Sequence, residues 1–171
     1  ENLAREILEL HTLGVDGGYT QHDVTEFAGA LTGWSVPRPR QLVEKKPTSA
    51  FAFYEQAHQP GTRTVLGRRY AESGEAQACA ILRDLALHPS TAKHLASKLT
   101  RHFVADQAPP AMVARLAKQY LNNNGDMSTV YQTLIESSEA WDLQYQKLRM
   151  PDDWLVAAVR VSAINIETYL R

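Results

Sequence analysis

The chain has little of what covalent cross-linking or metal–thiolate chemistry would need. Its 171 residues include one cysteine, Cys79, so no disulfide can form within the chain and a cysteine-based zinc site is excluded. No apolar run reaches the about 18 residues that a membrane helix needs, so no membrane span is predicted. A chain of this length can bury about 70% of the surface that its unfolded form exposes, so it can be stable without a disulfide or a zinc site.

A large charge of one sign is also missing. The net charge of −1 argues against nucleic acid as a partner, because affinity for the phosphate backbone needs an excess of cations. The charge is nevertheless uneven, with −5 over residues 1–36 and +5 over residues 37–70. The positive segment overlaps a Pro-rich basic loop that is predicted over residues 34–50. The cations of this loop are Arg38, Arg40, Lys45 and Lys46. No phosphate-binding loop or His-Glu-x-x-His motif occurs, so no cofactor is expected.

Apolar residues recur at helical spacing through most of the chain. Leu3, Ile7 and Leu10 share one face of a first helix, which Gly14 is expected to end. Thr20 is the predicted N-cap of the second helix, with Asp23 as its capping-box partner. Further helices are predicted near residues 75–87, 90–103, 110–122, 128–135 and 151–161. The sequence thus predicts a mainly α class, with about seven helices in an irregular bundle and a single helical domain over residues 1–171.

One stretch changes its period from helix to strand. Phe51 and Phe53 alternate with smaller or polar neighbours, and residues 64–66 form a second β-prone run. The residues 58–61 between them, His-Gln-Pro-Gly, read as a turn, so a small β-hairpin is predicted near residues 51–67. Among the helices, a stripe of Leu95, Leu99 and Phe103 is expected to be buried, and Trp141 and Trp154 are expected to anchor the core. The alternative is a sugar platform, lined by the aromatic residues Trp34, Trp141, Trp154, Tyr19, Tyr54 and Tyr70.

Several motifs together carry a family resemblance. They are the opening ENLAREILELHTLGV with DGGYT after it, HQPG at residues 58–61, TVLG at residues 64–67 and LTRHFV at residues 99–104. In these motifs the chain resembles the bacterial domain-of-unknown-function family 1800. The resemblance implies that this is the C-terminal part of a longer, exported protein, periplasmic or secreted, whose N-terminal portion is a partner. It implies no catalytic residues, since the family has no established activity.

A calcium loop is the first candidate site. Asp16, Thr20 and Asp23 follow a helix and a Gly-rich turn in an order that resembles an EF-hand. The usual ligands at the first and third loop positions are absent, and two carboxylates are few for calcium. The alternative interpretation is a capped turn between two helices, and no metal is predicted.

The second candidate is an anion site on the predicted helix near residues 90–103. His94, Lys98, Arg101 and His102 lie on one face at i, i+4, i+7 and i+8. Such a face can hold phosphate, sulfate or an acidic glycan through charge-assisted hydrogen bonds. The basic loop and Arg63, Arg68 and Arg69 could add cations to it. The alternative is a solvated face that binds nothing.

His58 is the third candidate, as a general base, because the ordinary pKa of imidazole suits that task. The alternative is a histidine that organises its turn by bonding to backbone. No complete catalytic set is visible in the sequence. The first hypothesis is therefore a helical binding or scaffold module of a larger exported protein, with an anionic or carbohydrate ligand. The second is part of a hydrolase-like enzyme acting on such a substrate, with an active site completed by the N-terminal portion.

Overall fold

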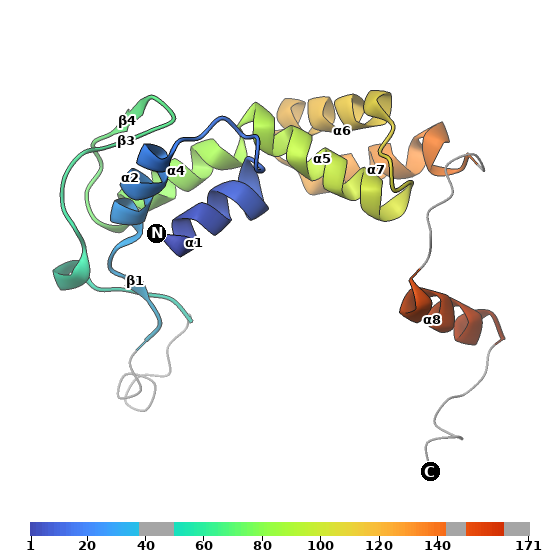
Figure 1. The fold of residues 1–171 in the computed structure, drawn as a ribbon, viewed down its shortest axis with the longest axis horizontal. Coiled ribbons are helices and arrows are strands. Elements are labelled where there is room, and N and C mark those ends of the chain that lie inside the picture. Colours follow the sequence, from blue (N-terminus) through green and yellow to red (C-terminus); the bar gives the residue numbers. More distant parts are fainter. Residues whose placement is uncertain (38–49, 143–149, 163–171) are drawn as a thin grey trace, which may run out of the picture.

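The computed structural model describes residues 1–37, 50–142 and 150–162. These ranges contain seven α-helices and two antiparallel sheets of two strands each, which confirms the mainly helical class (Figure 1). The helices are α1 (Asn2–Glu6), α2 (Gln21–Leu31), α4 (Glu75–Ala86), α5 (Pro89–Phe103), α6 (Pro110–Asn122), α7 (Met127–Glu136) and α8 (Pro151–Ser162). The strands are β1 (Trp34–Ser35), β2 (Ala52–Phe53), β3 (Arg63–Val65) and β4 (Arg68–Tyr70). Shorter turns are η1 (Ile7–Thr12), η2 (Glu55–Ala57) and η3 (Ser138–Ala140).

The opening helix–turn–helix has the predicted caps. Helix α1 continues into the π-helical turn η1, and Gly14 follows with φ of +87°, the conformation expected for a residue just after a helix. Helix α2 begins at Thr20, whose side chain accepts a hydrogen bond from the Asp23 backbone N–H while the Asp23 carboxylate accepts one from the Thr20 N–H. This is the predicted capping box.

The strands do not pair as predicted. Strand β2 pairs with β1, and β3 pairs with β4 across a two-residue turn, so no hairpin joins residues 51–54 to residues 64–66. The turn is Leu66-Gly67, and both residues have positive φ, 51° and 74°, as the tight turn of a twisted hairpin requires. Leucine rarely adopts this conformation, so a leucine at this point does not predict a hairpin turn.

The first two residues of the basic loop predicted over residues 34–50 form strand β1. Trp34 and Ser35 pair with Phe53 and Ala52, and the Trp34 ring packs edge-on against Phe51, with their centroids 4.9 Å apart. Its four predicted cations belong to residues 38–49, which lie outside the described residues. Within the described ranges, no helix combines the length and hydropathy that crossing a bilayer would need.

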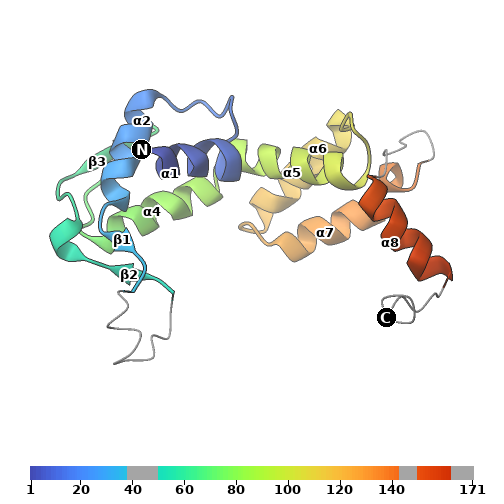
Figure 2. The ribbon, with the colours of Figure 1, turned by 60° about the horizontal axis from the view of Figure 1, so that its bottom comes forward.

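The buried apolar side chains form two clusters. The first joins α1, η1, α2, the β3–β4 hairpin and α4, and Leu8, Phe27 and Ile81 are its largest fully buried members. The second joins α5, α6 and α7 around Met112, Leu116 and other residues. Figures 1 and 2 show the two groups of helices lying at opposite ends of the α4–α5 axis.

The buried face of α5 differs from the predicted stripe. Its buried residues are small, namely Thr91, Ala92, Ala96 and Thr100. Leu95 and Leu99 pack at the margin of the second cluster, and Phe103 is 58% exposed. Small side chains let α5 approach α6 closely, so burial on this helix follows residue size rather than hydrophobicity.

The tryptophans expected in the core are exposed. Trp141 is 73% exposed and Trp154 is 62% exposed, and no described residue of α8 is buried. The prediction that they anchor the core is therefore wrong. Trp141 follows η3, where its indole Nε1 donates to the Ile135 carbonyl, and Trp154 lies on an α8 whose apolar side is uncovered.

One buried hydroxyl ties the second cluster to the end of α4. The Tyr120 hydroxyl donates to the Ala86 carbonyl at 2.8 Å, and burial raises the pKa of Tyr120. Replacing Tyr120 with phenylalanine should lower the free energy of unfolding by about 1 kcal/mol, because the carbonyl loses its partner. Urea unfolding measures this change. Tyr131→Phe on α7, where the ring is 46% exposed, is the matched control and should change stability by less than about 0.5 kcal/mol.

Candidate functional site

Helix α5 positions the residues of the predicted anion face. Pro89 occupies its first turn, where a missing N–H costs nothing, and the His88 side chain caps it by accepting from the Ser90 N–H at 3.1 Å. Because its buried face is narrow, the remaining residues of α5 are distributed toward η1, toward α6 and toward α7.

Two residues of that face contact the turn η1. The His94 ring Nε2 donates to the Leu10 carbonyl at 3.2 Å, and the Lys98 ammonium donates to the same oxygen at 3.4 Å. A side chain on Gly14 would lie 2.8 Å from the His94 ring, so the glycine allows this close approach. Both side chains thus place cationic or polar groups on the end of η1, where helix carbonyls are unpaired. Their first role is to hold η1 on α5.

Three of the four predicted residues line one hollow. Lys98, Arg101 and His102 border a cavity of about 540 Å³ whose floor is apolar. The floor consists of Leu95, Leu99, Phe103, Met127 and Tyr131. The His102 ring packs edge-on against Phe103, with centroids 4.5 Å apart. His94 does not line this hollow, so the structure brings together only part of the predicted face.

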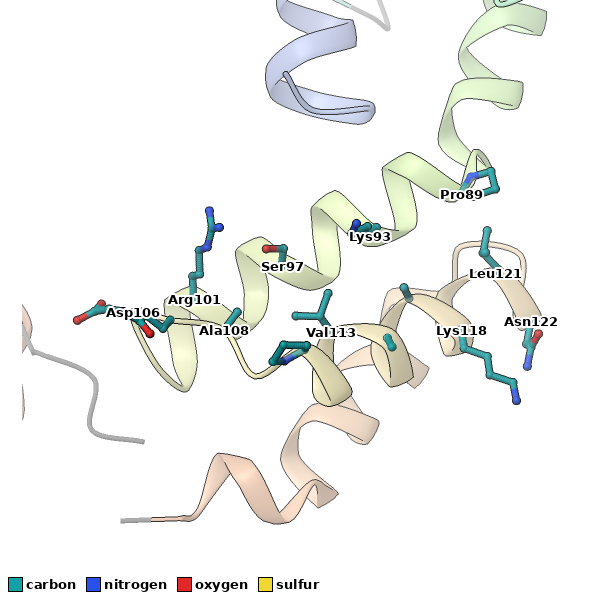
Figure 3. A pocket seen from close by; sticks show the side chains of 14 residues that line it. Pro89, Lys93, Ser97, Arg101, Asp106, Ala108, Val113, Lys118, Leu121 and Asn122 are labelled. Atoms are coloured by element: carbon teal, nitrogen blue, oxygen red, sulfur yellow. The ribbon is translucent and has the colours of Figure 1, made fainter. Parts of the chain in front are cut away.

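A larger groove lies on the other side of Arg101, between α5 and α6 (Figure 3). It encloses about 780 Å³, within the range typical of ligand sites. Small or aliphatic side chains make up most of its wall, including Ala108, Val113, Ala114, Ala117 and Leu121. We call it the α5–α6 groove. No aromatic side chain belongs to its lining, which does not favour a carbohydrate platform at this place.

Cations stand along both rims of the α5–α6 groove. Lys93 and Arg101 belong to α5 and Lys118 belongs to α6, and Figure 3 shows Arg101 and Lys118 directed away from the floor. Asp106 is the single carboxylate in the lining, at the same end of the groove as Arg101. The groove therefore combines an apolar floor with an excess of positive charge at its edges.

These three cations have no hydrogen-bond or ion-pair partner among the described residues. Arg68 and Arg115 behave differently. Arg68 lies 2.6 Å from Asp84, and Arg115 donates two hydrogen bonds to Glu139. These bonds lower the pKa of the Glu139 carboxyl. Three cations without such a partner lie around one apolar hollow, so an anion can bind there.

Arg63 and Arg68, which could have extended the anion site, belong to the first cluster. Arg63 lies 3.7 Å from Glu26 and crosses α2 at Gly29, where a Cβ would come within 2.6 Å of its guanidinium carbon. Arg68 lies over the Tyr70 ring and is paired with Asp84. Neither guanidinium lines a hollow around α5.

His58 organises its turn. Its Nδ1 donates to the Thr32 carbonyl at 2.9 Å, and the next residue, Gln59, donates its N–H to the Thr32 hydroxyl at 2.7 Å. A hollow of about 720 Å³ lies beside the ring, and its titratable side chains other than His58 are three carboxylates, Glu55, Glu72 and Glu75. Such a lining disfavours an anionic substrate. His58 and the α5 face line different hollows.

The residues of the calcium candidate serve the turn and the hairpin. Asp23 is 7% exposed, and its carboxylate accepts from the Thr20 N–H, the Thr20 hydroxyl and the Leu66 N–H at 2.6–2.7 Å. Burial acts to raise the pKa of Asp23, but these hydrogen bonds outweigh it and lower the pKa. Asp16 is exposed in the loop before Thr20. Within the described ranges, no three His, Cys, Asp or Glu side chains are grouped as metal ligands.

The sequence did not single out Lys93 and Lys118. Lys93, Ser97 and Arg101 recur at i, i+4 and i+8, so a helical wheel could have shown them as a second face of α5. Lys118 could not be joined to that face without knowing how α6 packs against α5. The groove is a product of helix packing, which residue spacing alone does not define.

A family described as "Protein of unknown function (DUF1800)" matches residues 1–171. No curated protein and no solved structure matches the chain.

Proposed function

The chain belongs to the DUF1800 family, and we propose that it is a helical binding module for an anionic ligand that also has an apolar part. The observation that carries the proposal is the α5–α6 groove, where three cations without a partner among the described residues rim an apolar floor. An anion without an apolar part would leave the apolar floor exposed to water. A neutral apolar molecule would leave the cations without a bound anion. A ligand with both features satisfies the whole surface.

The proposal keeps the module as part of a larger exported bacterial protein, with the N-terminal portion of that protein as a partner. This part rests on the family resemblance. The hydrolase alternative needs His58 and the cations of α5 to act on one substrate. Since the two line different hollows, and carboxylates surround His58, no observation favours that alternative.

A fluorescent probe tests the proposed site. Anilinonaphthalene sulfonate (ANS) carries a sulfonate on an apolar ring system, and N-phenyl-1-naphthylamine is the same molecule without the charge. ANS should bind with its fluorescence enhanced, and the neutral compound should bind more weakly by about tenfold, the worth of one charge-assisted hydrogen bond. Fluorescence titration at fixed ionic strength measures both affinities, with near-ultraviolet circular dichroism confirming that the protein stays folded.

Substitutions locate the binding. Arg101→Gln and Lys118→Gln should each weaken ANS binding by about tenfold, since each removes one cation from a rim. The matched control is Arg83→Gln on α4, an exposed cation outside the groove, which should leave the affinity unchanged. Equal losses in all three variants would show that ANS follows overall charge, and the proposed site would then be wrong.

A further inference from the structure

Helix α8 has an apolar side that the described structure leaves uncovered. Trp154, Leu155 and Val156 are 62%, 58% and 52% exposed, and Val159 follows Leu155 at i+4. The first turn carries Asp152 and Asp153. Successive helical residues point about 100° apart, so Leu155 and Val159 share one face and Trp154 and Val156 lie on either side of it. The helix is therefore acidic at its start and apolar over most of its circumference, which are the two properties that the α5–α6 groove complements.

We infer that α8 docks in the α5–α6 groove of its own chain, where it competes with the ligand. This inference deepens the proposed function, because it makes the same groove a site of regulation. An amphipathic helix in a two-helix groove is a recurrent mode of recognition, in which apolar residues at helical spacing fill the groove and charges meet at the rims.

The lengths agree. Helix α8 has 12 residues and is about 18 Å long, and α6, which forms one wall of the groove, has 13 residues and is about 20 Å long. A third helix laid along α6 would therefore cover the groove from end to end.

The segment that leads to α8 begins next to α6, which forms one wall of the α5–α6 groove. Arg115 on α6 holds Glu139 of η3 through hydrogen bonds of 2.6 and 2.7 Å, and Asp142 follows three residues later. Ala114, the neighbour of Arg115, lines the groove. From Asp142 to Pro151 the chain can span at most about 30 Å, more than the length of the groove. Docking within one chain also benefits from a high effective concentration.

The charges suggest one orientation. Figure 3 shows Lys93 and Lys118 nearer one end of the groove and Arg101 at the other. Two carboxylates in the first turn of α8 match the end with two cations. In this orientation Leu155, one turn after Asp152, lies opposite Ala114, one turn before Lys118. Ala157 lies on the opposite face of α8 and points away from the groove.

Disulfide trapping in the full chain tests this contact, in a background where Cys79 is alanine. Ala114→Cys with Leu155→Cys should form an intrachain disulfide under mild oxidation. Ala114→Cys with Ala157→Cys is the matched control and should react about tenfold more slowly, because its thiol faces away. Asp152→Lys with Asp153→Lys should slow trapping of the first pair, and adding Lys118→Glu should restore it.

The outcomes separate this inference from the proposed function, since trapping does not depend on any ligand. Equal rates for the two cysteine pairs, or disulfides formed only between chains on a denaturing gel, would overturn docking within the chain. If the inference holds, Asp152→Lys with Asp153→Lys should also tighten ANS binding by about fivefold, because a competing occupant is removed. An unchanged ANS affinity would show that α8 does not compete, and it would overturn the regulatory part.

Discussion

Replacing Asp23 with alanine is expected to lower the free energy of unfolding by about 3 kcal/mol, since it removes a buried carboxylate and leaves two part-buried N–H groups without an acceptor. The carboxylate accepts hydrogen bonds from the Thr20 N–H at the start of α2 and from the Leu66 N–H in the β3–β4 turn. One buried side chain thus fixes a helix start and a hairpin that lie 43 residues apart. Leu66 has positive φ, so its turn depends on this bond.

The effect of Asp23 should depend on pH. The pKa of its carboxyl is lowered in the folded protein, so its stabilisation is complete above the unfolded value of about 3.9 and is lost as the pH falls through the folded value. Urea unfolding of the wild type and of Asp23→Asn between pH 7 and pH 3 should therefore show a difference that shrinks toward low pH. A constant difference would contradict the assigned role.

A matched control for Asp23 is available in the same loop. Asp16 is exposed, so Asp16→Ala should change stability by less than about 0.5 kcal/mol. Similar losses in Asp16→Ala and Asp23→Ala would indicate that the loop acts as one ligand-binding unit rather than as a capped turn.

Replacing Gly33 with alanine is expected to cost about 3 kcal/mol, from the combined cost of positive φ and steric overlap. Gly33 has φ of +86°, and a Cβ there would lie 2.8 Å from the Tyr54 carbonyl oxygen and 2.9 Å from the Phe53 ring. The Tyr54 backbone cannot retreat easily, because its N–H donates to the Gly33 carbonyl at 2.8 Å. Relief of the overlap would separate β1 from β2.

Gly18 isolates the steric part of this effect. Its φ of +87° is nearly the same, and a Cβ there would meet nothing within 4 Å. Gly18→Ala should therefore cost only the conformational part, about 1 kcal/mol. Urea unfolding of both variants measures the difference. If the two substitutions cost the same, the close approach of Gly33 to Tyr54 does not contribute to stability.

Local chemistry in this sequence predicted local structure well. The capping box of Thr20 and Asp23 and the helix end at Gly14 follow from residue types at fixed offsets, and both are confirmed. Strand pairing was wrongly predicted because the turn places Leu66 at positive φ, where its N–H donates to Asp23, a residue far away in the sequence. The burial of α5 also differed, because small residues rather than Phe103 face α6.

The candidate site was partly predictable for the same reason. A helical wheel of α5 gives its cations, including Arg101, but it does not show that Lys98 turns toward the Leu10 carbonyl. Nor does it show that Lys118 of α6 joins the same groove. Both facts depend on which helices pack side by side, and the spacing of residues within one helix does not determine this packing.

The central claim is that the α5–α6 groove is the ligand site of this protein. Mapping backbone amide chemical shifts by nuclear magnetic resonance during an ANS titration tests it most directly. We expect the saturable shifts to concentrate on the groove walls, which are residues 89–101 of α5 and residues 106–122 in α6 and the turn before it. Shifts concentrated instead on residues 53–76, around His58 and its three glutamates, would contradict the claim.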